Sequence, residues 1–183
     1  MQPQRTAAPE GPAARIRWNP VAVFPAAHGT IVQSSGAEVI SDGGNGRKPA
    51  VTRLIDTVAW VHLAEGRLLT ARSRGKDVFY IPGGKRDPGE SDLEALVREV
   101  REELTVALLP ETVAHLGTWT GQADGQPEGT LVRMACYTGE YRGTLAASSE
   151  IEEIAWLGLA EKHRTAVVDH EVFDLLAARG EVW

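Results

Sequence analysis

Residues Gly84–Val106 read GKRDPGESDLEALVREVREELTV, and they contain the clearest helix pattern in the chain. The centre of this stretch predicts a helix over Ser91–Leu104, because Ser91 and Glu94 form a capping box in which each side chain bonds to the other residue's backbone amide. Apolar residues recur along the helix on a single stripe: Leu93, Leu96, Val97, Val100 and Leu104. We expect this stripe to face the core.

The other side of the predicted helix is acidic. Glu99, Glu102 and Glu103 fall within an arc of roughly 100° that points away from the apolar stripe. Three like charges at this spacing repel one another, and the helix dipole disfavours anions in the C-terminal half of a helix. A bound Mg²⁺ or Mn²⁺ reverses that sign, because these cations prefer clustered carboxylate oxygens. The alternative is a solvated acidic face interleaved with Arg98 and Arg101.

The residues before the helix add to the metal-site interpretation. Gly83 and Gly84 let the backbone turn tightly, so that a carbonyl oxygen can face the same site. Residues 87–89, Asp-Pro-Gly, supply a turn. If this loop folds back, Glu90 can pair with Arg98 about two helical turns further along.

The whole stretch resembles the signature of the Nudix hydrolase family, G-x5-E-x7-R-E-U-x-E-E-x-G-U with U aliphatic, and looks MutT-like. The matching positions are Gly84, Glu90, Arg98, Glu99, Val100, Glu102, Glu103 and Val106. One position departs, since Thr105 replaces the glycine after the helix. That glycine takes a left-handed conformation that a β-branched residue enters poorly, so we expect the helix to end differently or to run on slightly.

The resemblance implies a Nudix-type α/β/α sandwich with a mixed β-sheet, and hydrolysis of a diphosphate bond in a nucleoside diphosphate linked to another group. It also implies roles: Arg98 orients Glu99, and Glu90 braces Arg98. The implied ligands of Mg²⁺ or Mn²⁺ are Glu99, Glu102, Glu103 and the Gly84 carbonyl, with Glu150 as a further candidate. Glu150 lies six residues before Trp156, a spacing similar to that of an additional metal-binding glutamate in MutT-type members; the alternative is a plain surface acid.

Five further residues are candidates for substrate binding. Lys85, Arg72 and Arg74 are placed to contact phosphates, although a solvated loop explains the two arginines equally well. Tyr80 and Trp156 are candidates for stacking on a base, whereas strand aromatics usually fill the core. His163 and His170 have no metal-ligand spacing, and we expect surface histidines.

Alternating and apolar runs predict strands around the main helix. Leu54–Leu63 and Leu68–Arg72 are expected to form a hairpin across the turn at residues 65–67. The other predicted elements are strands at Val78–Ile81, Val113–Thr120, Leu131–Tyr141 and Ile154–Leu157, and a helix over Ala166–Ala178. Strands interleaved with two helices indicate an α/β sandwich with a mixed sheet.

Two parts of the chain differ in composition. Residues 51–183 are expected to form the Nudix hydrolase domain, and residues 1–50 an N-terminal extension that is flexible or pairs Ile31–Val39 as an edge strand. A role of the extension in a homodimer, or in covering the active site, is the alternative.

Composition and charge exclude several classes of protein. The 183 residues are 43% hydrophobic with a formal net charge of −6, which is typical of a globular domain and argues against a nucleic-acid partner. The single cysteine, Cys136, excludes an internal disulfide, and we expect it to be a buried small hydrophobe. No apolar stretch approaches the roughly 20 residues that span a bilayer, so we expect no membrane partner. No secretory leader is evident, and we expect a cytoplasmic location.

The resemblance to the Nudix hydrolases, together with these observations, predicts a Mg²⁺-dependent pyrophosphohydrolase with a small-molecule nucleotide substrate. A nucleoside triphosphate is the first candidate for that substrate. The alternatives are a nucleotide-sugar or dinucleotide pyrophosphatase, or a nucleotide-sensing protein that keeps the fold without catalysis.

Overall fold

The computed structural model describes residues 53–183. The N-terminal extension, including the edge strand predicted at Ile31–Val39, lies outside the described residues, and the domain boundary near residue 50 stays a prediction.

The larger sheet has four strands in the order β4-β1-β7-β6. They are β1 (Arg53–Trp60), β4 (Gly83–Lys85), β6 (Ala114–Gln122) and β7 (Thr130–Thr138). β1 is parallel to β7, whereas the β1–β4 and β6–β7 pairs are antiparallel. The mixed sheet predicted from the sequence is therefore confirmed.

A second, three-stranded sheet has the order β2-β3-β9, and two short strands pair on their own. The three-stranded sheet contains β2 (Leu63–Ala64), β3 (Arg67–Ser73) and β9 (Ile151–Leu157), and the short pair is β5 (Ala107–Leu108) with β8 (Tyr141–Arg142). The hairpin predicted between Leu54–Leu63 and Leu68–Arg72 was wrong in its first strand, because only β2 pairs with β3. At the C-terminal end of β1, the Trp60 amide instead donates to the Pro82 carbonyl, and the Val61 amide donates to the Tyr137 carbonyl.

The strand predicted at Val78–Ile81 was also wrong. Phe79 and Tyr80 make only isolated bridges, to Thr165 after η2 and to Ala71 on β3, so this stretch touches the smaller sheet without forming a strand. The Phe79 carbonyl accepts a hydrogen bond from the Ala166 amide. The last helix starts at Asp169, three residues later than predicted.

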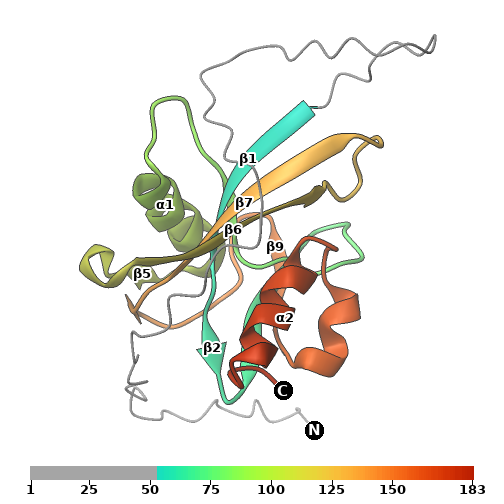
Figure 1. The fold of residues 1–183 in the computed structure, drawn as a ribbon. Helices are drawn as coiled ribbons and strands as arrows, with labels where there is room; N and C mark the ends of the chain where they lie inside the picture. Colours follow the sequence, from blue (N-terminus) through green and yellow to red (C-terminus); the bar gives the residue numbers. More distant parts are fainter. Residues whose placement is uncertain (1–52) are drawn as a thin grey trace, which may run out of the picture. The chain divides into compact units, whose positions relative to one another are not determined.

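Two helices cover opposite faces of the larger sheet (Figure 1): α1 (Asp92–Leu104) and α2 (Asp169–Ala178). Two short 3₁₀ helices, η1 (Pro110–Thr112) and η2 (Leu159–Arg164), lie in the connections. Alternate β1 residues serve the two cores: Val58 and Trp60 pack with the α1 side, and Ala59 packs with the α2 side. Two helical layers around a mixed sheet confirm the predicted α/β/α sandwich.

Helix α1 keeps its predicted start but differs in two side chains. The capping box between Ser91 and Glu94 is present. Leu93 was wrongly assigned to the buried stripe, since it is 39% exposed. Glu103 was wrongly assigned to the outer face, since only 6% of it is exposed. Its carboxylate accepts a hydrogen bond from the Gly83 amide, and its carbonyl accepts one from the Ser148 amide in the loop after β8.

The end of α1 is where the Nudix signature places it. Thr105 adopts the left-handed conformation with φ 62°, so the prediction of a different helix end was wrong. Its hydroxyl donates a hydrogen bond to the Thr144 carbonyl (3.1 Å). This bond offsets part of the strain of a β-branched residue in that conformation.

Candidate active site

Arg98 is the centre of the site on α1. Its Nε and Nη2 atoms donate to the two oxygens of Glu90, each at 2.8 Å, so the pairing expected from the sequence forms. Its Nη1 atom donates to Glu99 Oε1 (2.9 Å), and Nη2 also donates to the Lys85 carbonyl (3.1 Å). The Arg98 guanidinium lowers the pKa of Glu90 to about 2. One guanidinium thus fixes the loop before the helix and a carboxylate on the helix.

The two glycines before the helix allow β4 to approach α1 and β1 closely. A Cβ atom on Gly84 would lie 2.4 Å from the carboxyl carbon of Glu99. A Cβ atom on Gly83 would lie 2.1 Å from the Val58 carbonyl oxygen, and Gly83 has φ +146°. The Gly83 amide donates to Glu103 Oε2 (3.0 Å). Only glycine fits at position 83, where backbone atoms would meet the Cβ atom, whereas at position 84 the Glu99 side chain would have to move. Both glycines pack against or bond to a candidate ligand.

Glu103 and Glu99 are carboxyl groups removed from water. Burial raises the pKa of Glu103 to about 8, although the hydrogen bond from Gly83 opposes this shift. Burial also raises the pKa of Glu99, against the ion pair with Arg98. The negative charges of Glu102 and Glu150 raise both values further. Four carboxyl groups therefore interact unfavourably when they are all ionised.

This donor set fits a hard divalent cation. Clustered carboxylate oxygens that repel one another are the ligands that Mg²⁺ and Mn²⁺ prefer, and a cation removes the repulsion. Within residues 53–183, no three His, Cys, Asp or Glu side chains converge closely enough to enclose an ion as they stand. The Glu99 and Glu103 carboxylates are turned toward Arg98 and the Gly83 amide instead.

Glu150 lies at the far side of the cluster, immediately before β9. It is exposed, and its carbonyl accepts a hydrogen bond from the Arg74 amide (2.9 Å). Hydrogen bonds from Ser149 and from its own amide lower its pKa. Its negative charge raises the pKa of both Glu99 and Glu103, and its role as a metal ligand stays a prediction.

The three basic side chains proposed to contact phosphates differ in their present partners. Arg72 donates to Glu152 (2.9 Å) and Glu153 (2.8 Å), which compete with a phosphate for its charge. Arg74 and Lys85 are exposed. Their phosphate contacts stay predictions.

The two candidate aromatic residues lie in separate places. The Tyr80 hydroxyl donates to Asp124 (2.5 Å) in the loop before β7. Trp156 packs on the α1 side of the structure, with its ring 5.7 Å from that of His62. The structure does not bring them together around a shared base, so each is a separate candidate.

The histidine and cysteine predictions have mixed outcomes. Cys136 is buried in β7, as expected. His163 is exposed, but His170 is half-buried and its Nε2 atom is enclosed without a hydrogen-bond partner within residues 53–183. His170 was therefore wrongly assigned to the surface.

Sequence reasoning missed the buried carboxyl group of Asp169. It is 1% exposed, and Oδ2 accepts a hydrogen bond from the Ile81 amide (3.3 Å). Burial raises its pKa to about 8. The available signal was an acid directly after the apolar run at residues 166–168, at the start of a predicted helix.

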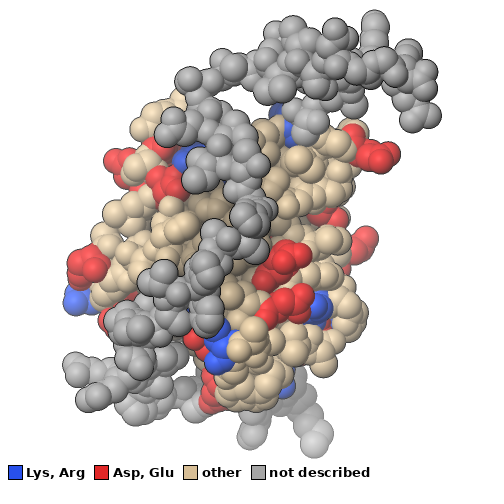
Figure 2. Space-filling view, in the orientation of Figure 1, with Lys and Arg blue, Asp and Glu red and all other residues tan. Residues whose placement is uncertain are grey.

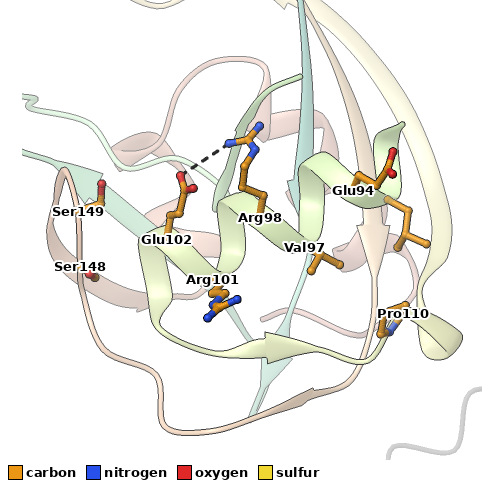
Figure 3. A pocket seen from close by; sticks show the side chains of 9 residues that line it. Glu94, Val97, Arg98, Arg101, Glu102, Pro110, Ser148 and Ser149 are labelled. Carbon is orange, nitrogen blue, oxygen red and sulfur yellow. Dashed lines mark ion pairs between the residues drawn. The ribbon is translucent and has the colours of Figure 1, made fainter. Parts of the chain in front are cut away.

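An open hollow follows the outer face of α1 (Figure 3). Glu102 and Arg98 lie on one side of it with 3.7 Å between their charged atoms, and Val97 and Pro110 lie further along. Acidic and basic side chains are scattered over the face drawn in Figure 2, so exposed charge by itself does not mark the site. The features that distinguish the candidate site are the burial of Glu103 and the ion pair that holds Glu99.

An α/β/α sandwich with an acidic, arginine-braced helix after a Gly-Gly strand is the arrangement of the Nudix hydrolases. The NUDIX domain model matches residues 52–176. The CTP pyrophosphohydrolase of Escherichia coli (strain K12) is 28% identical over 109 residues, which are 57% of this chain and 76% of that protein. The ADP-ribose pyrophosphatase of Methanocaldococcus jannaschii is 31% identical over 96 residues, which are 52% of this chain and 54% of that protein.

A solved structure agrees in fold. The solution structure of the E. coli ORF135 protein has a TM-score of 0.56 and 27% sequence identity, over 70% of this chain and 92% of that one. The chain belongs to the NUDIX family and is a hydrolase of that family. Nudix hydrolases generally use divalent metal ions. No helix within residues 53–183 is long and apolar enough to cross a membrane.

Proposed function

We propose that this chain is a Mg²⁺- or Mn²⁺-dependent pyrophosphohydrolase that cleaves the diphosphate linkage of a nucleoside di- or triphosphate derivative. One observation carries the proposal: Arg98 holds Glu99 beside Glu103, while burial and nearby charge disfavour ionisation of both acids. Placing these carboxyl groups next to one another does not favour the folded state. A site for a divalent cation, in contrast, needs carboxylate oxygens close together.

Each residue has a distinct part in the proposal. The metal ligands are Glu99, Glu102, Glu103, Glu150 and the Gly84 carbonyl. When bound, a divalent cation neutralises phosphate charge and lowers the pKa of a water molecule. Arg98 orients Glu99, and Glu90 orients Arg98. The base that accepts the proton of the attacking water is one of the clustered glutamates, and Lys85, Arg72 and Arg74 are the candidates for phosphate contacts.

We infer the substrate class from the type of bond that the relatives cleave, and not from recognition of a particular nucleobase. Both curated relatives described above are named for cleavage of pyrophosphate bonds, in CTP and in ADP-ribose. We propose a MutT-like nucleoside triphosphate as the first substrate to test, and nucleotide sugars and dinucleotides as alternatives. Tyr80 and Trp156 are the aromatic candidates for contact with the base.

A hydrolysis screen tests the proposal. The purified full chain is incubated with Mg²⁺ or Mn²⁺ and nucleoside triphosphates, nucleotide sugars and dinucleotides, and the products are identified by mass. We expect metal-dependent release of pyrophosphate, phosphate or a nucleoside monophosphate, and a loss of about 10²-fold or more in Glu103→Gln. Metal-independent cleavage, or none with any compound, overturns the proposal. Nucleotide binding without turnover would favour the sensing alternative.

Location and assembly are separate predictions. The cytoplasmic location stays a prediction. The solution mass of the chain with and without residues 1–50 tests the homodimer.

A further inference from the structure

Five side chains form a series of contacts between the larger sheet and the start of α1, called the ring here because both of its ends lie on β7. Arg133 on β7 donates to Asp56 on β1 (2.5 Å), and Asp56 lies 3.6 Å from Arg86. Arg86 donates to Asp92 in the first turn of α1, and Tyr137 on β7 donates to the other oxygen of Asp92 (2.5 Å). The ring therefore starts and ends on the same strand.

None of these residues belongs to the ligands or to the Arg98–Glu90 pair. We propose that the ring positions the metal ligands through Arg86. This residue holds the loop after β4 in place against α1, and so sets the affinity of the glutamate cluster for a divalent cation. This inference rests on the proposed function.

The first argument is where Arg86 lies along the chain. The residue before it, Lys85, accepts a hydrogen bond from Arg98 Nη2 through its carbonyl (3.1 Å). The residue after it, Asp87, donates its amide proton to Glu90 Oε2 (2.8 Å). The backbone on both sides of Arg86 thus holds the Arg98–Glu90 pair. The Arg86 side chain ties the same backbone to β1 and α1.

The second argument concerns the charges of the ring. Two arginines face two aspartates, so the cluster is neutral and does not favour a charged ligand in the small cavity of about 170 Å³ that it lines. Burial opposes ionisation of Asp92, but hydrogen bonds from Tyr137 and Arg86 outweigh it and hold the pKa of Asp92 below its ordinary value. Asp92 is therefore ionised at neutral pH and keeps its ion pair with Arg86.

The third argument concerns stability. Between 29% and 40% of each charged side chain in the ring is exposed. Ion pairs at such exposure contribute little to the stability of a fold. The ring's contribution is therefore to geometry more than to stability, because Arg86 ties the loop that follows Gly84 to β1 and α1. Since the Glu99 carboxylate packs directly on Gly84, a shift of this loop displaces a candidate metal ligand.

The test measures metal affinity apart from hydrolysis. The full chain is titrated with Mn²⁺ alone, and free Mn²⁺ is followed by electron paramagnetic resonance. We expect Arg86→Met, which keeps the stem of the side chain and removes its charge, to raise the Kd for Mn²⁺ about tenfold, as loss of a partner behind a metal ligand does. Arg86→Lys should recover affinity to within about threefold of wild type.

One variant serves as a matched control. Arg67→Gln removes the surface ion pair with Glu161, and neither residue belongs to the ring. It should leave the Kd for Mn²⁺ within about twofold of wild type. If Arg86→Met does not fold, Tyr137→Phe removes only the hydroxyl that holds Asp92 and should weaken Mn²⁺ binding about threefold.

The hydrolysis assay supplies a second readout. In Arg86→Met, the Mg²⁺ concentration for half-maximal rate should rise while kcat at saturating Mg²⁺ stays within about threefold of wild type. A folded Arg86→Met that binds Mn²⁺ as wild type does overturns the positioning role. A wild-type chain that binds Mn²⁺ but hydrolyses nothing overturns the proposed function instead, and the titrations still decide the role of Arg86.

Discussion

Replacing Gly84 with alanine isolates the contact between β4 and the Glu99 carboxylate. The new Cβ atom would lie 2.4 Å from the Glu99 carboxyl carbon, where ordinary contacts are 3.4 to 4 Å. The Glu99 carboxylate must therefore move by about 1 Å, and a displacement of that size near reacting groups costs about 10²-fold in rate. Gly84 is not among the residues with positive φ, so alanine introduces no backbone strain there.

The cost in stability should be small by comparison. The clash involves the far end of a flexible side chain, so the free energy of unfolding should fall by about 1 kcal/mol, the low end for overpacking. For a chain of this size that is a loss of about 2–4 °C in Tm. The assay combines kcat/KM on the best substrate of the screen with thermal unfolding of the same sample. We expect a large loss of activity in a protein that remains folded at the assay temperature.

Gly180→Ala is the control for this experiment. Gly180 has φ +70° with nothing near the position of a Cβ atom, so alanine there adds strain without a clash. It should lower the free energy of unfolding by about 1 kcal/mol and leave kcat/KM unchanged. If Gly84→Ala keeps kcat/KM within about threefold of wild type, the close approach of Gly84 to Glu99 has no role in the reaction, and the reasoning is refuted.

Three further predictions concern α1. Glu90→Gln should lower kcat/KM about tenfold through Arg98. Because the pKa of Glu90 is depressed to about 2, its contribution to stability is present above about pH 4.5 and is lost as the pH falls toward 2. The difference in stability between wild type and Glu90→Gln, measured by urea unfolding, should therefore shrink over that range; a constant difference contradicts the pairing. Thr105→Gly relieves the left-handed threonine and should raise the free energy of unfolding by about 0.5–1 kcal/mol, and a lower Tm would show that the Thr144 bond outweighs the strain. Leu93→Ala should cost under about 1 kcal/mol and Leu96→Ala about 2–5 kcal/mol, because only Leu96 is buried; equal losses in chemical denaturation would contradict the assignment.

Local sequence rules predicted what depends on local geometry. The capping box at Ser91 and the pairing of Glu90 with Arg98 follow from chemistry within one helix and the turn before it, and both form. The partners of the strands do not follow from local rules, because an apolar run favours a strand without saying which neighbour it pairs with. For this reason the predicted hairpin was wrong in its first strand.

The burial of individual helical residues also depends on distant segments. A helical period gives the face on which Glu103 lies, but its hydrogen-bond partners Gly83 and Ser148 come from outside the helix, 20 and 45 residues away in the chain. Leu93 continues the apolar stripe in the sequence, yet the described structure leaves it 39% exposed. The ring through Arg86 was hidden for the same reason, since its members come from β1, β7, α1 and the loop after β4.

The energetics of α1 connect these observations to function. A helix of this length gains nothing from Glu99, Glu102 and Glu103 in its C-terminal half, where the dipole and their mutual repulsion both act against them. Arg98 compensates Glu99, while Glu103 is buried with one amide donor, and burial raises the pKa of both acids. Any cation that binds the folded cluster and not the unfolded chain therefore stabilises the protein by mass action. A divalent cation, whose charge and ligand preference would offset this cost, is the occupant that we propose for the cluster.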